Sequence, residues 1–319
     1  MLDPDFYRRY RVLPTPWFFQ SSYQFYRAWV AATRTRVVAE NFDRLDARPM
    51  IIATNSTQNQ DFMAIRLLAG QRNVKMVTVT KAKNYHSRIM AFALERLGVV
   101  PIASKGYFIL VDAIATLGRR PTDAQYRALR DHLERDAAVD DAELEPVLHR
   151  PRPIFGRPFD PQQTSWRTLV QSIYQDSLSE TVRLSREAVQ AGHHVQMYPE
   201  GTVSRRLGRG RNGAVQLAHA LDLAILPVGM SGCPEAFIGT SPMVRGGEIR
   251  LRVGEPIALP KGLLPGDFRP FDPVHEAAHQ ASLQRVTDEV MGQLNALVDP
   301  PYRRAEGEVG PGKGTRAHF

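Results

Sequence analysis

The sequence has one cysteine among 319 residues, Cys233, and no apolar run of membrane-spanning length. A single thiol excludes an intrachain disulfide and any cysteine cluster that could bind a metal, so we expect a reducing compartment and no metal site. A helix that crosses a membrane needs about 18 uninterrupted apolar residues, so we expect any membrane contact to be peripheral. The opening residues, MLDPDFYRRYRVLPTP, also lack the basic and then apolar order of a secretory signal, which favours a cytoplasmic location.

Acidic residues are fewer than basic ones: 33 Asp and Glu stand against 41 Lys and Arg, and the net charge is +8. This excess favours anionic partners such as phosphate-bearing metabolites, an acidic membrane surface or nucleic acid. No nucleic-acid-binding motif accompanies the charge, so we expect no nucleic-acid partner. The hydrophobic fraction of 43% and the charged fraction of 23% are typical of a folded globular protein and exclude wholesale disorder.

Aromatic residues are concentrated near the start of the chain, where the first thirty residues hold ten of them. At about 100° per residue, the segment 18–30 places its aromatic side chains on one side of a helix and Gln20, Gln24 and Arg27 on the other. Such a helix packs on the protein core, which is the commoner case, or lies in a membrane surface, where Trp and Tyr are favoured. We therefore predict an aromatic-rich helical segment at residues 1–48 and leave both positions for the helix open.

From residue 50 onwards, apolar strands alternate with helical segments. The predicted strands are 50–54, 74–80, 99–102, 194–198, 224–230 and 248–254, and the predicted helices are 61–68, 85–97, 178–190 and 212–221. Alternation of this kind indicates an α/β domain with a mixed, mostly parallel central sheet flanked by helices. We place this domain at residues 49–298.

Two segments depart from this alternation. Residues 105–165 contain two possible helices and then the loop HRPRPIFGRPFDP, whose prolines predict irregular structure, so we interpret the stretch as a helical and loop insertion. The end of the chain, residues 299–319, is polar and rich in Gly and Pro, and we predict a disordered tail.

Polar residues follow the strand at 50–54, in the segment ATNSTQNQDFMAI. Such groups are exposed at the carboxyl end of an α/β sheet. The segment resembles the His-x4-Asp signature of glycerolipid acyltransferases, with Asn55 and Asp61 at its two ends and Ser56 in the place of the histidine. The resemblance implies a histidine that acts as general base and an Asp61 that orients it. A serine hydroxyl is a poor base at pH 7, so a contribution of about 10²–10⁴ in rate is lost or supplied elsewhere.

A second block, MYPEGTVSRR, resembles the Phe-Pro-Glu-Gly-Thr-Arg-Ser block of the same family. Glu200, Gly201 and Thr202 stand in register with it. Val203 replaces an arginine that the resemblance would place on the phosphate of the acceptor. Compared with the family block, this block therefore keeps the glutamate and the glycine and lacks the arginine.

Four arginines lie in the run RRLGRGRNG, residues 205–213. Arg205 and Arg206 follow the second block directly, and a guanidinium there could bind the same phosphate from a shifted position. The glycines of the run also let the backbone approach an anion closely, as binding of coenzyme A or a lipid head group would require. The alternative is a solvated basic loop.

Three further blocks fit the family in order. LERLGVVPIAS resembles a Leu-Gly-x-x-Pro-x-x-Arg block in which Ser104 takes the place of the arginine and Lys105 is adjacent. AILPVGMSG and RVGEPIAL resemble two later strands of the family. With these blocks, the resemblance covers residues 49–104 and 185–258.

The resemblance implies an O-acyltransferase of the lysophosphatidate or glycerol-3-phosphate type. An acyl group would pass from acyl-CoA or acyl-carrier protein to a hydroxyl of a lysolipid or glycerolipid-type acceptor, in phospholipid biosynthesis at the cytoplasmic face of the membrane, with no permanently bound cofactor. Ser56 and Asp61 would stand at the catalytic position. The substrate-binding residues would be Asn55, Ser104, Lys105, Glu200, Gly201, Thr202, Arg205 and Arg206. The alternative is a catalytically inactive homologue that binds lipid or a partner protein, which would explain the loss of the histidine and of both arginines together.

The same residues also have purely structural interpretations. Ser56 could be the N-cap of the helix that follows, and Asp61 could stabilise the first turn of that helix. Glu200 and Thr202 could simply fix the loop after their strand. The histidines nearest to the blocks in sequence, none of which has the motif spacing, are His86, His193 and His194.

Overall fold

The structure is a computed structural model that describes residues 2–46, 48–85, 87–239, 241 and 243–305. The chain forms two compact units. Unit 1 comprises Met1–Arg11, Thr80–Glu95 and Val100–Leu184, and unit 2 comprises Val12–Val79, Arg96–Val99 and Ser185–Phe319. The domain boundaries drawn from the sequence stay a prediction.

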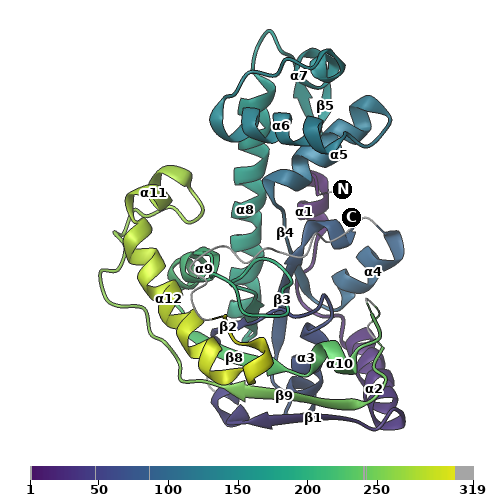
Figure 1. Cartoon of the computed structure of the whole chain (residues 1–319), viewed down its shortest axis with the longest axis vertical. Coiled ribbons are helices and arrows are strands. Elements are labelled where there is room, and N and C mark those ends of the chain that lie inside the picture. Colours follow the sequence, from purple (N-terminus) through teal and green to yellow (C-terminus); the bar gives the residue numbers. More distant parts are fainter. Residues whose placement is uncertain (1, 47, 86, 240, 242, 306–319) are drawn as a thin grey trace. The chain divides into compact units, whose positions relative to one another are not determined.

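The main sheet has the strand order β1-β9-β8-β2-β7-β3-β4 (Figure 1). Its strands are β1 (Thr35–Glu40), β2 (Ile51–Thr54), β3 (Met76–Lys81), β4 (Val99–Ile102), β7 (His194–Met197), β8 (Ile225–Ser231) and β9 (Gly247–Val253). β2 is parallel to both of its neighbours, β7 and β8, and β7 is parallel to β3. β9 runs antiparallel to β8 and parallel to β1.

Helices flank the sheet in unit 2. They are α2 (Pro16–Ala32), α3 (Phe62–Gln71), α9 (Gly213–Leu221), α10 (Cys233–Ala236), α11 (Pro273–Ala278) and α12 (Gln280–Leu297), with the 3-10 turns η1 (Phe42–Asp46) and η4 (Pro300–Tyr302). α12 packs along β8 and α9 (Figure 1). Every residue of β2 is buried, as expected for a parallel strand that is covered on both faces. The predicted fold class, α/β with a mixed, mostly parallel sheet flanked by helices, is confirmed.

The N-terminal helix α2 packs one side on the core of unit 2. Tyr26 and Val30 are buried there. Trp17 and Phe25, by contrast, are 65% and 61% exposed, so part of the apolar surface of α2 is not covered by the core. Among the described residues, no helix combines the length and the hydrophobicity that crossing a membrane requires.

Unit 1 is mostly helical. Its elements are α1 (Pro4–Arg9), η2 (Ala82–Tyr85), α4 (Arg88–Arg96), α5 (Lys105–Leu117), α6 (Asp123–Arg135), η3 (Ala142–Leu144), α7 (Glu145–His149), β5 (Arg152–Ile154), β6 (Arg157–Phe159) and most of α8 (Trp166–Gln190). Asp112 of α5 is buried and joins three of these elements. It accepts a hydrogen bond from Trp166 Nε1 at 2.8 Å and forms an ion pair with Arg152 at 2.5 Å. The segment 105–165 is therefore folded around a buried polar centre.

The prediction of irregular structure for HRPRPIFGRPFDP is wrong, because β5 and β6 form an antiparallel hairpin. Phe155 and Gly156 connect the strands, and both have positive φ, at 48° and 77°, as a two-residue hairpin turn requires. Pro153 lies opposite Pro158, next to the pair that closes the turn. An antiparallel ladder alternates hydrogen-bonded and non-bonded pairs, so two prolines at a non-bonded pair remove no hydrogen bond.

Residues 299–305, which the sequence assigns to a disordered tail, include the short helix η4 and belong to unit 2. Tyr302 of η4 is 5% exposed, and its hydroxyl accepts a hydrogen bond from the backbone N–H of Gly232 at 3.1 Å. The backbone N–H of Asp299 donates to Ser231 Oγ at 2.9 Å. An aromatic ring and two polar contacts hold this segment in unit 2, although its composition is typical of disorder. The rest of the predicted tail, residues 306–319, lies outside the described residues.

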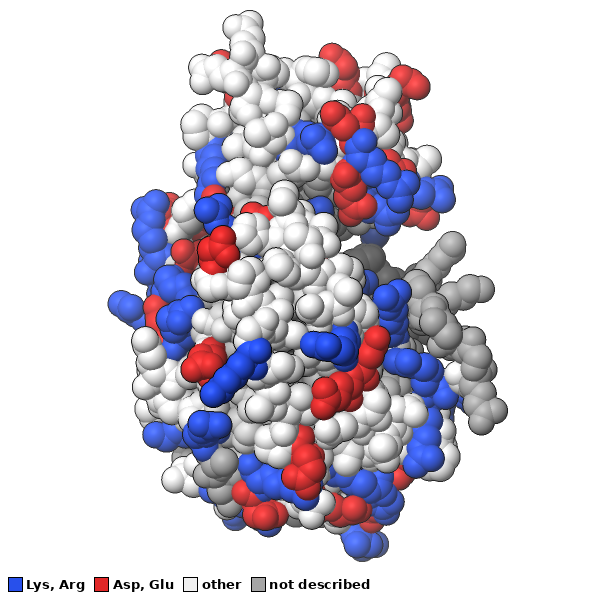
Figure 2. Space-filling model, turned by 90° about the vertical axis from the view of Figure 1, so that its left-hand side faces the viewer, with Lys and Arg blue, Asp and Glu red and all other residues white. Residues whose placement is uncertain are grey.

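The net positive charge is distributed rather than gathered on the face shown in Figure 2, where Lys and Arg side chains are interspersed with Asp and Glu. Ion pairs also bring the two signs together at the surface, as between Arg157 and Asp176 at 2.5 Å and between Arg252 and Glu40 at 3.1 Å. On this face, the excess of positive charge therefore indicates no single anion-binding surface.

Candidate active site

Two turns meet where β2 and β7 end. Because these strands are parallel neighbours, the segments that follow them emerge at the same edge of the sheet. The backbone N–H of Ser56 donates to Glu200 Oε2 at 3.1 Å, and the backbone N–H of Ser204 donates to the carbonyl of Ser56 at 2.8 Å. The two sequence blocks thus form one structure, residues 55–61 and 198–204, which we call the double turn.

Asp61 closes the first turn upon itself. Its carboxylate accepts the backbone N–H groups of Thr57, at 2.5 Å, and Gln58, at 2.9 Å, and the buried thiol of Cys233 is a further hydrogen-bond partner. Burial raises the pKa of Asp61 to about 7, although these hydrogen bonds favour the charged form. Cys233 was not predicted at this position, and no sequence pattern connects it with Asp61.

Glu200 links the second turn to the first and to the loop beyond. In addition to the N–H of Ser56, its carboxylate accepts the N–H of Gly208 at 2.8 Å, and the residue is 3% exposed. Burial raises the pKa of Glu200 to about 7, the two N–H groups oppose this, and the negative charge of Asp61 adds to it. A buried carboxyl group with a pKa near 7 can accept and release a proton at neutral pH.

Ser56 is not a helix N-cap. α3 begins at Phe62, and the N-cap position is Asp61, whose side chain makes no cap hydrogen bond. Ser56 is 5% exposed, and no described residue forms a hydrogen bond with its hydroxyl. Its backbone N–H and carbonyl, by contrast, both hold the second turn.

Asn55 anchors the double turn to the sheet. Its side-chain Nδ2 donates to the carbonyl of Met230 at 2.9 Å, and its Oδ1 accepts the N–H of Met230 at 2.7 Å. Both ends of the amide are therefore bonded to the backbone of β8, and an amide is needed because an acid could only accept. A substrate contact for Asn55 stays a prediction.

Neither described histidine near the motifs lies at the double turn. His194 is at the amino end of β7, where its Nδ1 accepts the N–H of Met50 at 3.2 Å. His193 precedes β7, and burial lowers its pKa. Both are at the opposite end of the strand from Glu200, and His86 lies outside the described residues.

Gly201 forms the tight part of the second turn, with its N–H donating to the carbonyl of Tyr198 at 3.0 Å and φ at +63°. A Cβ at this position would lie 3.2 Å from Cδ of Arg211, so this arginine lies over the turn. The backbone N–H of Arg211 also donates to the carbonyl of Pro199 at 2.8 Å. The sequence shows Arg211 only as one of four arginines in the run 205–213, because nothing local indicates that the loop folds back.

The arginines of this loop differ in what they contact. Arg205, a predicted substrate-binding residue, donates from Nη2 to Glu235 Oε1 at 2.8 Å in an exposed pair. Arg206, Arg209 and Arg211 are exposed, and none forms an ion pair with a described acidic residue. These three guanidinium groups are therefore the ones open to an anionic ligand, whereas Arg205 already has a partner.

Ser104 and Lys105 belong to unit 1, at the start of α5. Ser104 is the N-cap of this helix, since its Oγ accepts the N–H of Tyr107 at 3.2 Å. The Nζ of Lys105 lies 5.7 Å from the ring centroid of Tyr174, in a cation–π contact. Both residues have structural partners, and their part in substrate binding stays a prediction.

In the part of the chain that the structure describes, no group of His, Cys, Asp and Glu side chains is arranged to hold a metal ion. No family model and no curated protein matches the chain. Among solved structures, it is similar to the 1-acyl-sn-glycerophosphate (LPA) acyltransferase PlsC from Thermotoga maritima, with 14% sequence identity and a TM-score of 0.41. The match covers 86% of this chain and 76% of that one. Because this likeness is weak, it gives no support for a function of this chain.

Proposed function

We propose that the protein is an acyl-thioester-dependent O-acyltransferase in which Glu200, and not a histidine, is the general base. One observation carries the proposal. A buried carboxylate from the second block is hydrogen-bonded to the backbone of Ser56, the position where the sequence signature would have its histidine. An acceptor hydroxyl that docks beside Ser56 would therefore face a group able to take up its proton.

The reaction balances with this carboxylate alone. Glu200 takes the proton of the acceptor hydroxyl while the hydroxyl oxygen attacks the carbonyl carbon of the thioester. The carbon–sulfur bond then breaks, and the leaving thiolate takes the proton from Glu200, so the base is regenerated. Two amide donors leave lone pairs of the carboxylate available, because an ionised carboxylate has about four acceptor sites.

The other residues of the double turn would support this base. Asp61 holds the first turn in shape and, through its charge, helps to keep the pKa of Glu200 near 7. The hydroxyl of Ser56 would orient the acceptor. Exposed guanidinium groups of Arg206 and Arg211 would hold an anionic group of the donor or the acceptor, since Arg binds phosphate in a bidentate way.

The substrates follow the sequence resemblance: acyl-CoA or acyl-carrier protein as donor and a lysolipid or glycerolipid-type alcohol as acceptor. A lipid acceptor requires access to a membrane surface. The exposed rings of Trp17 and Phe25 on α2 would provide a peripheral contact on the inner face of the membrane, because such rings favour the membrane boundary.

The test is acyl transfer from a radiolabelled acyl thioester to a lysolipid by the full-length chain. We expect transfer by the wild type, a loss of about 10²–10⁴ for Glu200→Gln, which removes the base, and at most a small loss for Ser56→Ala. The matched control is Glu289→Gln, because Glu289 is an exposed glutamate of α12. Equal rates for Glu200→Gln and the control would contradict the assignment of the base.

A second candidate function is a catalytically inactive lipid-binding or partner-binding protein. The burial of the double turn favours it, since Asp61 is 0% and Glu200 3% exposed and both carboxylates already hold backbone N–H groups. For this candidate, wild-type transfer would be at background and Ser56→His would create activity. Native mass spectrometry of the purified chain adds a readout, because a retained phospholipid favours the binding protein and a retained acyl donor favours the enzyme.

A further inference from the structure

The last described residues of the chain contact the loop that holds Glu200. The backbone carbonyl of Tyr302 accepts the N–H of Leu207 at 2.8 Å, and Nη2 of Arg304 donates to the carbonyl of Gly208 at 2.9 Å. The N–H of the same Gly208 donates to Glu200 Oε1 at 2.8 Å. One residue therefore lies between the guanidinium of Arg304 and the carboxylate of Glu200, and it is bonded to both.

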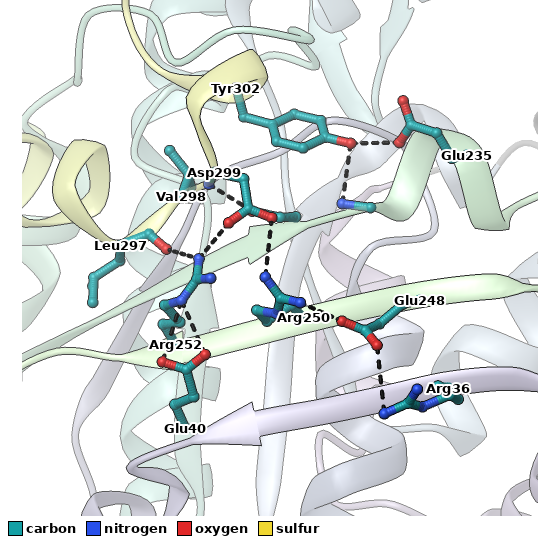
Figure 3. Close-up of polar contacts among 12 residues, drawn as sticks. Arg36, Glu40, Glu235, Glu248, Arg250, Arg252, Leu297, Val298, Asp299 and Tyr302 are labelled. Atoms are coloured by element: carbon teal, nitrogen blue, oxygen red, sulfur yellow. Dashed lines mark hydrogen bonds and ion pairs between the residues drawn. The ribbon is translucent and has the colours of Figure 1, made fainter.

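This terminal segment is itself firmly attached to unit 2 (Figure 3). The hydroxyl of Tyr302 accepts the N–H of Gly232 and donates to Glu235. The carboxylate of Asp299 accepts a hydrogen bond from Nη1 of Arg252 at 2.7 Å. These contacts come from Gly232, which follows β8, from α10 and from β9, so the segment has a fixed position from which it can hold the loop.

Arg304 also acts on Glu200 by its charge. Burial is the largest influence on Glu200 and raises its pKa to about 7, and the negative charge of Asp61 adds to this rise. The N–H groups of Gly208 and Ser56 lower the pKa, and the positive charge of Arg304 lowers it to a smaller extent. Arg304 thus has two effects on the same carboxylate, one geometric through Gly208 and one electrostatic. Both effects favour an ionised carboxylate held beside Ser56.

We propose that Arg304 is a positioning residue, which fixes Gly208 so that Gly208 holds the carboxylate of Glu200 against Ser56. The segment from Asp299 to Arg304 would then be an essential part of the site and not a tail. The positioning depends only on the hydrogen bonds of this chain, whereas its consequence for acyl transfer rests on the proposed function.

The experiment compares Arg304→Gln with Arg303→Gln and Arg304→Lys in the full-length chain. Arg303 is the matched control, because it is the neighbouring exposed arginine and its Nε donates to the carbonyl of Val298 instead of to the loop. Two readouts are needed: the titration of the Glu200 carboxyl by 13C NMR, assigned with Glu200→Gln, and hydrogen exchange of the Gly208 N–H.

For Arg304→Gln we expect the Glu200 titration to move to higher pH and the Gly208 N–H to exchange roughly 2- to 10-fold faster, as for the loss of one hydrogen bond. Arg304→Lys keeps the charge, so Glu200 should titrate close to its wild-type pH. The Gly208 N–H should still exchange fast in this variant. Arg303→Gln should change neither. If Arg304→Gln and Arg303→Gln behave alike in both readouts, the proposal is wrong.

The same variants separate this proposal from the proposed function. If Arg304→Gln shifts the Glu200 titration and the wild type transfers acyl groups, the pH midpoint of acyl transfer by Arg304→Gln should shift in the same direction as the titration. If the titration shifts but the wild type shows no transfer, the positioning role stands and the acyltransferase proposal falls.

Discussion

The two halves of the double turn each hold a buried carboxylate on backbone N–H groups, but they use it differently. Asp61 accepts N–H groups from its own turn, three and four residues earlier in the chain. Glu200 accepts one N–H from Ser56, which belongs to the other turn, and one from Gly208, which belongs to the following loop. The first carboxylate therefore shapes a local turn, and the second joins three separate segments.

This difference shows which residue the site depends on most. A local turn can be held by other short-range contacts when its carboxylate is replaced, because the chain itself keeps the groups close. Segments that are far apart in sequence have no such connection. We therefore expect substitutions at Glu200 to disturb the whole double turn and substitutions at Asp61 to disturb one loop.

The largest expected effect is that of Glu200→Ala on stability. It leaves the buried N–H of Ser56 and the partly buried N–H of Gly208 without an acceptor, and an unsatisfied buried group costs about 1–3 kcal/mol. We expect the free energy of unfolding, measured by urea denaturation at pH 6, to fall by roughly 3 kcal/mol. At this pH a carboxyl group with a pKa of about 7 is mostly protonated. Glu289→Ala, at an exposed position, should change it little. A comparable loss of unfolding free energy in Glu200→Ala and Glu289→Ala would contradict the role of Glu200 in joining the separate segments.

A second effect should appear in the pH dependence of stability. The pKa of Asp61 is raised from 3.8 to about 7 on folding, so between these values the folded state binds more protons than the unfolded state. The free energy of unfolding of the wild type should therefore fall as pH rises from about 4 to about 7 and then level off. Asp61→Asn removes this group and keeps Glu200, whose pKa is also raised to about 7, so thermal unfolding across that range should show a flatter but not a flat dependence. An equally steep fall in the variant would show that Asp61 is not the titrating group.

The smallest expected effect concerns the glycine of the second turn. Gly201→Ala places a Cβ at φ +63° and against Arg211, and a left-handed conformation costs a non-glycine residue roughly 1–2 kcal/mol. Gly292 lies inside α12 with open space around it, so Gly292→Ala should instead stabilise by roughly 0.5–1 kcal/mol. Changes of the same sign in denaturation experiments would contradict the strain assigned to Gly201.

The sequence predicted those parts of the fold that carry a strong local signal. The strands β2 and β7 are buried along their whole length and mostly apolar, and their parallel pairing follows from the helices between them. The helix α12 was missed although its buried residues Leu283, Val286, Val290 and Leu294 have helical spacing. The edge strand β1 was missed for a physical reason, since most of its residues are only partly buried and show no alternation.

The site was predictable as two blocks but not in its connections. The motifs locate Asp61 and Glu200, and the parallel pairing of β2 with β7 implies that they meet. The thiol of Cys233 beside Asp61 and the contact of Arg304 with Gly208 depend on tertiary packing over long sequence separations. A composition rich in Gly and Pro predicted disorder for the terminal segment, because composition does not show the buried ring of Tyr302 or the hydrogen bonds that hold the segment in unit 2.

The pH–rate profile of acyl transfer tests the central claim most directly, measured from a labelled acyl thioester for the wild type and for Glu200→Gln. A base with a pKa of about 7 predicts a wild-type rate that rises with pH and reaches half of its plateau near pH 7, and a Glu200→Gln rate that is low and lacks this rise. A wild-type rate at background at every pH, or a Glu200→Gln profile that keeps the rise near pH 7, would contradict the claim that this carboxylate replaces the missing histidine.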